Sequence, residues 1–112
     1  MAGISGNNWY VTTAGTNSGA TATKAADANG IHVITGVFGF GDKDASLTLK
    51  DGDTVVGEWL YDISAEAGAA ITYPKFNFQV EIQCAKGAAA AAVLSASTGD
   101  CRVTITGYTK YY

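Results

Sequence analysis

The feature that most constrains this chain is the alternation of apolar and polar residues with a period of two. It is clearest in FNFQVEIQC (residues 76–84), where every second residue, beginning with Phe76, is apolar or a cysteine. The segment CRVTITGYT (residues 101–109) begins with the same alternation. Successive side chains of a β-strand point to opposite faces, so each segment predicts a strand with one buried and one solvated face.

Other segments also have the composition of strands. Residues 31–40 (IHVITGVFGF) are dense in β-branched and aromatic residues, and Gly36 and Gly39 within them indicate a bulge or a close backbone approach. Helical propensity alone would favour a helix over residues 85–92, but the turn residues that follow favour a strand pair. Further strands are expected at residues 21–26, 45–50, 54–61, 70–73 and 92–96.

Turn residues separate these strands at short intervals. Asp27-Ala28-Asn29-Gly30 is typical of a hairpin turn, because Asn-Gly tolerates the positive φ of a tight turn. Ser97-Thr98-Gly99-Asp100 predicts a second hairpin that leads into the last strand. About eight short strands with short turns predict an all-β protein, a single β-sandwich that is jelly-roll-like, although the pattern does not fix the topology.

The length of 112 residues fits one domain. Residues 1–19 are rich in Gly, Asn, Thr and Ser, and we interpret them as an extended N-terminal arm that precedes a sandwich domain at residues 20–112. One apolar island, Trp9-Tyr10-Val11, interrupts the arm and is expected to dock on another surface.

Charge and composition exclude several classes of function. The net charge is −3, and the seven basic residues are scattered rather than gathered in a stripe, which argues against nucleic acid as a partner. No segment approaches the roughly 20 apolar residues that span a membrane. The first residues lack a charged leader and an apolar core, so we expect no secretory signal and folding in a cytosol. Only 15% of residues are charged, which predicts an uncharged surface that a partner can cover.

The order of the segments resembles that of capsid decoration (cement) proteins of tailed bacteriophages and related virion β-sandwiches. The resemblance rests on IHVITG at residues 31–36, SLTLKDG at 46–52, the apolar strand after Pro74, and AVLSASTGD followed by VTITGY at 92–108. It implies a non-enzymatic protein of the virion, assembled in the bacterial cytoplasm, that sits on the major capsid protein as a dimer or trimer.

Aromatic residues near both ends are the candidate partner-binding residues. Trp9 and Tyr10 are expected either to bind in a groove of a neighbouring molecule or to pack on their own domain. Tyr111 and Tyr112 are further candidates, although they match no pattern that we can name.

Cys84 and Cys101 both fall on the inward face of their strands, and these strands flank the Ala-rich segment. Two interpretations stay open. A disulfide would close a loop of about 18 residues and contribute roughly 3 kcal/mol in the chain-entropy model. The alternative is two buried thiols, as in other cytosolic proteins.

The sequence offers no catalytic set, metal site or cofactor site. His32 is the one histidine, and its strand parity sets it opposite Ile31, Val33 and Val37, so we expect it at a surface or an interface. No serine lies in a nucleophile motif. Four aspartates cluster around two predicted turns, and their spacing matches no EF-hand loop; they are Asp42, Asp44, Asp51 and Asp53.

Two alternatives to a decoration protein stay open. One is another part of the virion, a tail or head-fibre module. The other is a carbohydrate-binding β-sandwich in which Trp59, Tyr61 and Tyr73 stack against sugar rings. Aromatic residues in strands are more often core or interface residues, which is the competing interpretation of these three.

Overall fold

The computed structural model describes residues 8–16, 18–41, 45–61, 75–95 and 100–111, and all of its regular elements in these ranges are strands. The predicted strand at residues 70–73 lies outside the described residues. The eight strands are β1 (Asn8–Thr16), β2 (Ala20–Lys24), β3 (Gly30–Gly41), β4 (Ala45–Asp51), β5 (Thr54–Tyr61), β6 (Lys75–Gln83), β7 (Ala90–Leu94) and β8 (Asp100–Tyr111).

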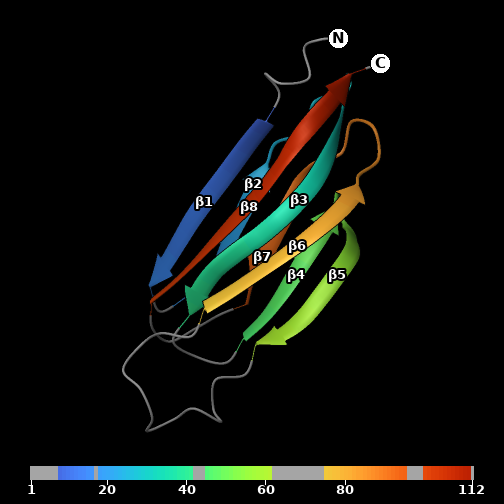
Figure 1. Ribbon diagram of the computed structural model, residues 1–112. Coiled ribbons are helices and arrows are strands. Elements are labelled where there is room, and N and C mark those ends of the chain that lie inside the picture. The colour runs from blue at the N-terminus through green and yellow to red at the C-terminus, as the bar shows by residue number, and fades with distance from the viewer. Residues whose placement is uncertain (1–7, 17, 42–44, 62–74, 96–99, 112) are drawn as a thin grey trace, which may run out of the picture.

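The strands form two four-stranded antiparallel sheets, in the orders β1-β8-β3-β6 and β2-β7-β4-β5 (Figure 1). The chain is thus paired first with last, β1 with β8, and then inward through β2 with β7, β3 with β6 and β4 with β5. This nested pairing, rolled into two facing sheets, is a jelly roll. The predicted all-β sandwich is confirmed, and the topology that the pattern left open is settled.

Both predicted hairpins join strands of different sheets, so neither is a hairpin. Asp27–Gly30 is a turn, in which the Gly30 amide donates to the Asp27 carbonyl at 2.9 Å, but it leads from β2 in one sheet to β3 in the other. The segment around Ser97 likewise connects β7 to β8 across the sandwich. A jelly roll crosses between its sheets at most connections, and turn composition alone does not distinguish a crossing from a hairpin.

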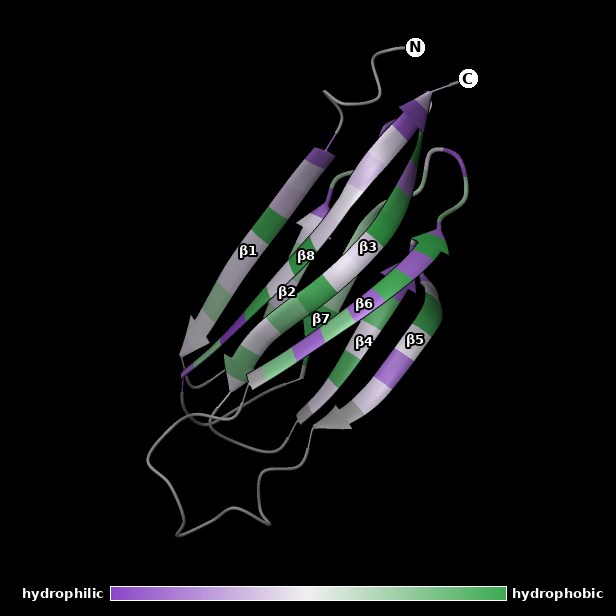
Figure 2. Ribbon diagram, viewed as in Figure 1, coloured by the Kyte–Doolittle hydropathy of each residue, from purple (hydrophilic) through white to green (hydrophobic). Residues whose placement is uncertain are grey.

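The hydrophobic core lies between the two sheets and follows the period-two pattern. Ile34 on β3, Ile105 on β8 and Leu49 on β4 have no exposed surface. Figure 2 shows the pattern along β6, where hydrophobic and hydrophilic bands alternate. Ala85–Ala92, which propensity alone would make helical, instead leads into β7, whose Ala90, Ala92 and Leu94 side chains complete the core.

The predicted N-terminal arm differs from the structure over residues 8–16. This segment is β1, and it pairs with β8 without a break from Asn8 opposite Tyr108 to Thr16 opposite Asp100. Its side chains alternate between exposed and half-buried. An edge strand with one solvated face needs few apolar residues, so its composition resembles that of an unstructured arm. Residues 1–7 and 17 lie outside the described part of the chain.

Removing one core side chain tests this packing. Ile105→Ala should lower the free energy of unfolding by about 2–5 kcal/mol, because the side chain is fully buried and leaves a cavity. Thr21→Ala, at an exposed position of β2, is the matched control and should change it by no more than about 0.5 kcal/mol. Urea denaturation followed by fluorescence measures both, and equal losses would contradict the assigned core.

Candidate functional site

The outer face of the β1-β8-β3-β6 sheet is the most distinctive surface of the described residues. Paired residues on antiparallel strands share a face, so Tyr10 of β1 lies beside Thr106 of β8, and Phe38 of β3 lies beside Thr104. The Tyr10 side chain is 74% exposed and that of Phe38 is 44% exposed. Large exposed aromatic rings set among threonines make a surface that a partner can cover with little desolvation of charge.

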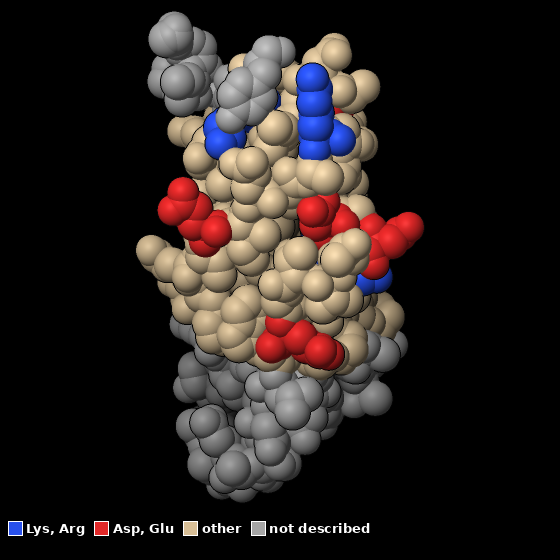
Figure 3. Space-filling model, turned by 90° about the vertical axis from the view of Figure 1, so that its right-hand side faces the viewer, with Lys and Arg blue, Asp and Glu red and all other residues tan. Residues whose placement is uncertain are grey.

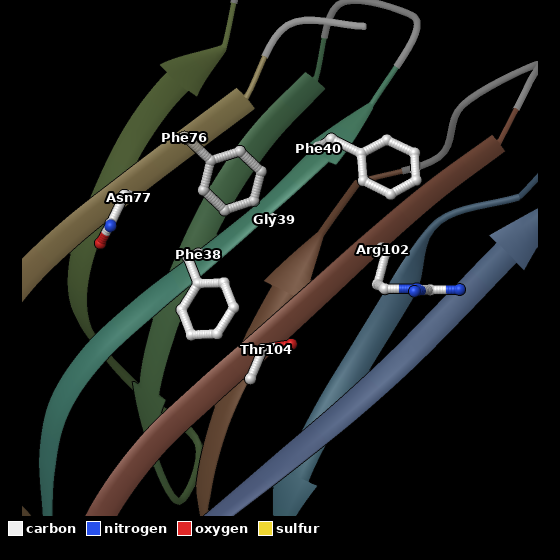
Figure 4. A pocket seen from close by; sticks show the side chains of 7 residues that line it. All are labelled: Phe38, Gly39, Phe40, Phe76, Asn77, Arg102 and Thr104. Atoms are coloured by element: carbon white, nitrogen blue, oxygen red, sulfur yellow. The ribbon is translucent and has the colours of Figure 1, made fainter.

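A hollow of about 420 Å³ lies on this face at the end of β3 (Figure 4). We call it the Phe38 pocket. Its lining combines aromatic rings with one guanidinium, one amide and one hydroxyl, contributed by Phe38, Gly39, Phe40, Phe76, Asn77, Arg102 and Thr104. Pockets that bind small molecules or side chains share this combination of apolar walls and a few polar groups.

The strand register explains why these side chains meet. Phe40 lies opposite Arg102, and Phe38 lies between Thr104 on β8 and Asn77 on β6. Gly39 is needed between them, because a Cβ atom there would lie 3.0 Å from the Phe76 ring and would collide with the backbone of Arg102. The close backbone approach that was predicted at Gly39 is therefore present, and Gly39 is one of the residues that line the pocket.

At the other end of the same sheet, His32 lies inside the sandwich. It is 1% exposed, so the expectation of a surface or interface histidine is wrong. Its Nε2 is 2.8 Å from the Ala25 carbonyl and its Nδ1 is 2.8 Å from the Thr109 hydroxyl. In a neutral imidazole, Nε2–H donates to the carbonyl and Nδ1 accepts from the hydroxyl. A histidine with both nitrogens bonded in the core is structural.

Trp9 completes this cluster. Its Nε1 donates to the Thr109 hydroxyl at 2.9 Å, and its ring meets that of His32 edge-on, with centroids 5.6 Å apart. Gly107 makes room for the indole, since a Cβ there would be 2.6 Å from it. The apolar island therefore docks through Trp9 on its own domain, whereas Tyr10 points outward.

The C-terminal candidates differ in what the structure describes. The Tyr111 side chain is 53% exposed, and its hydroxyl donates to Asp27 Oδ2 at 2.6 Å. Tyr112 lies outside the described residues. Partner binding by Tyr10 and Tyr111 stays a prediction.

Cys84 and Cys101 are both buried, as predicted, but they cannot form a disulfide within the chain. The Cys84 amide donates to the His32 carbonyl at 2.9 Å, whereas Cys101 lies opposite Gly41, nine positions further along β3. At about 3.3 Å per residue the two are roughly 30 Å apart, and a disulfide needs Cα atoms within about 7 Å. Burial, and then the Asp51 carboxylate, raise the pKa of Cys84 to about 11, so it is an unreactive thiol at neutral pH.

Trp59 does not form a sugar platform. Its ring stacks on that of Phe78 with centroids 4.7 Å apart and packs against the core. The competing interpretation, a core aromatic, is confirmed for Trp59. The side chain of Tyr61 and the whole of Tyr73 lie outside what the structure describes.

Asp51 lies at the turn between β4 and β5, as expected, but it bonds a distant amide rather than a local one. Its carboxylate accepts the Ala85 amide at 3.1 and 3.2 Å, and the following Gly52 has a φ of 61°, which favours glycine. Asp42 and Asp44 lie outside the described residues. Within the described ranges, no group of three or more His, Cys, Asp or Glu is placed to hold a metal ion. The same ranges contain no helix with the length and apolar character needed to cross a bilayer.

Comparison with known proteins finds matches among solved structures. No protein-family model matches the chain, and no curated protein matches its sequence. The CBM36-1 domain of a multidomain xylanase from the hindgut metagenome of Trinervitermes trinervoides is 15% identical, with a TM-score of 0.41 over 88% of this chain and 96% of that one. The coat protein of Tobacco streak virus is 10% identical, with a TM-score of 0.40 over 96% of this chain and 92% of that one.

The cluster around Thr109 can be tested by removing its hydroxyl. Thr109→Val keeps the shape of the side chain but leaves Trp9 Nε1 and His32 Nδ1 without their partner, so the free energy of unfolding should fall by about 1–3 kcal/mol. Thr23→Val, at an exposed position of β2, is the control. Urea denaturation gives both values, and an unchanged stability of Thr109→Val would show that these hydrogen bonds contribute nothing.

The contact between Tyr111 and Asp27 has a consequence for pH dependence. The Tyr111 hydroxyl, and then the Asn29 amide, lower the pKa of Asp27 below its usual value, so Tyr111→Phe should raise it. A lowered folded-state pKa gives stability that is present above the unfolded-state pKa and is lost as the pH falls through the folded-state pKa. The variant should therefore be less stable than the natural protein near pH 7 and should approach it in acid. An NMR titration of Asp27 checks this, and an unchanged pKa would contradict it.

Proposed function

We propose that this protein is a non-enzymatic component of a virion, a capsid decoration (cement) protein that binds the major capsid protein lattice and stabilises it. The observation that carries the proposal is the outer face of the β1-β8-β3-β6 sheet, with Tyr10 and Phe38 exposed among threonines. A broad, weakly charged face with aromatic anchors suits adhesion to another protein.

The Phe38 pocket would receive a side chain of the capsid subunit. Aromatic residues and arginine are the residue types that most often dominate binding energy at interfaces, and the pocket contains both, in Phe38 and Arg102. Arg102 is exposed at its rim, where a guanidinium can bind a carboxylate of the partner with two parallel hydrogen bonds. The proposed anchor is therefore an apolar side chain in the pocket beside an acidic residue at the rim.

Stabilisation of the shell follows from mass action. A protein that binds only the assembled lattice, and not the separate subunits, shifts the equilibrium towards the assembled state. No catalytic group is needed for this effect. The core hydrogen bonds of His32 and the high pKa of Cys84 are consistent with a sandwich whose buried polar groups serve the fold.

Replacing Phe38, which lines the pocket, tests this function. Phe38→Asp should weaken binding to assembled heads of the virus that encodes the protein by about thirtyfold or more, as expected when an anchor worth about 2 kcal/mol is lost. Val55→Asp is the matched control, since Val55 is 52% exposed on β5 in the other sheet. Cosedimentation with heads measures both variants.

The outcomes test separately whether the protein binds heads and which sheet it binds them with. Saturable binding that is lost in Phe38→Asp and kept in Val55→Asp supports both. Loss in Val55→Asp alone would assign docking to the other sheet. A natural protein that binds no heads, or that binds only tails or head fibres, would overturn the decoration role.

The Phe38 pocket also favours a second candidate function, carbohydrate binding. An exposed phenyl ring beside an amide, a hydroxyl and a guanidinium offers both stacking and hydrogen bonds to a sugar. Here the binding ring is Phe38 rather than Trp59. Glycan-array binding that disappears in Phe38→Ala, in a protein that ignores heads, would favour this function over decoration.

A further inference from the structure

The two sheets have four edge strands, β1 and β6 in one and β2 and β5 in the other. An edge strand presents unpaired N–H and C=O groups, to which a strand of another chain can bind. Soluble proteins protect such edges with charged residues, bulges or short strands. An edge without any of these features is therefore a candidate interface.

Three of the four edges are protected. β6 carries the exposed Glu81 near its end, and β2 has only five residues and ends in Lys24. β5 carries the exposed Glu58, and its register with β4 shifts between Leu49 and Lys50. On the side of the molecule where β5 and β6 lie, acidic and basic side chains stand out on the surface (Figure 3).

β1 has no such protection. It is nine residues long (NWYVTTAGT), contains neither a charged residue nor a proline, and pairs with β8 without a register shift. None of the described backbone groups bonds to its outer edge. In Figure 1 it lies on the side opposite β5, and in Figure 2 it carries little strongly hydrophilic colour beyond its first residue.

We propose that the outer edge of β1 binds β1 of a second copy of this chain, antiparallel, about a two-fold axis at Thr12. This register pairs all nine residues. Even-numbered residues of one copy lie opposite even-numbered residues of the other, so the outer face of one copy continues into the outer face of the other. The strand is also complementary to itself in size. On the outer face, the large Tyr10 lies opposite the small Ala14 of the second copy, and Thr12 lies opposite itself.

The energetics favour this occupant. Nine antiparallel pairs form about eight to ten backbone hydrogen bonds, because alternate pairs exchange two bonds each. The two sheets become one continuous sheet of eight strands. Each Tyr10 ring packs beside Ala14 of the other copy, and its outward side stays open to a partner. An isologous contact of this kind closes on itself, so it yields a dimer and not a fibre.

The dimer deepens the proposed function, on which its biological role rests. A two-fold axis perpendicular to the sheet leaves both outer faces on the same side. Each dimer therefore presents two Phe38 pockets towards one shell. Two linked weak contacts bind far more tightly than one, because the second contact forms at a high effective concentration.

Cysteine cross-linking tests the register. In Thr12→Cys the two new thiols lie opposite each other across the axis, with Cα atoms about 5 Å apart, so mild oxidation should give a disulfide-linked dimer. Ala14→Cys is the matched control, because its two thiols are four positions out of register, about 13 Å apart. The natural cysteines are buried and should not interfere. Equal cross-linking of both variants, or none in Thr12→Cys, would overturn the proposal.

Light scattering tests the dimer without cross-links. The natural protein should have twice the mass of the chain, Thr12→Lys should be monomeric because two lysines meet at the axis, and Thr21→Lys on β2 should stay dimeric. Circular dichroism confirms that each variant is folded. A monomeric natural protein would overturn the proposal, even if binding to heads protected its β1 amides from hydrogen exchange. A dimer that binds no heads would overturn only the decoration role.

Discussion

The pairing of β3 with β8 supports the rest of the structure. The two strands are twelve residues long each and pair from Gly30 opposite Tyr111 to Gly41 opposite Cys101. They form the centre of their sheet, with β1 and β6 on either side. Their inward residues Ile34 and Ile105 are fully buried. Because the partners are about 70 residues apart in sequence, the chain must close a long loop before this contact forms, as is typical of slow-folding sandwiches.

The same pairing produces the two surfaces on which the proposals rest. By register it sets Phe38 beside Thr104 and Phe40 beside Arg102, which makes the pocket, and it offers the far side of β8 to β1. At the opposite end it holds His32 beside Thr109, where Trp9 anchors the start of β1. The edge strand is therefore held in place by a core cluster rather than by the backbone ladder alone. A rigid edge costs less entropy to pair than a flexible arm does.

The sequence predicted the strands better than it predicted their partners. Alternation over residues 76–84 and 101–109 gave the inward faces of β6 and β8, because a period of two is a local property. Which strands pair is not local, so the turns at Asp27–Gly30 and near Ser97 were misread as hairpins. His32 was misplaced because the register shifts between Ile34 and Gly36, which brings His32 and Val37 to the same face. Parity correctly predicted that Cys84 and Cys101 are buried, but it carries no information on their separation along β3.

The site was predictable only in part. The low share of charged residues predicted a surface with few charges, and the glycine at position 39 indicated a close approach. The pocket, however, needs three strands in register. Residues 8–16 have a composition that fits either an unstructured arm or an edge strand, and only their pairing with β8 shows that they form a strand.

If the sandwich works by adhesion, its effect should appear in the thermal stability of the shell it binds. Calorimetry of heads that lack the protein, with increasing amounts added, measures this directly. The unfolding temperature of the shell should rise and level off once the sites are filled. An unfolding temperature that stays constant at every ratio of protein to shell would contradict a stabilising coat protein.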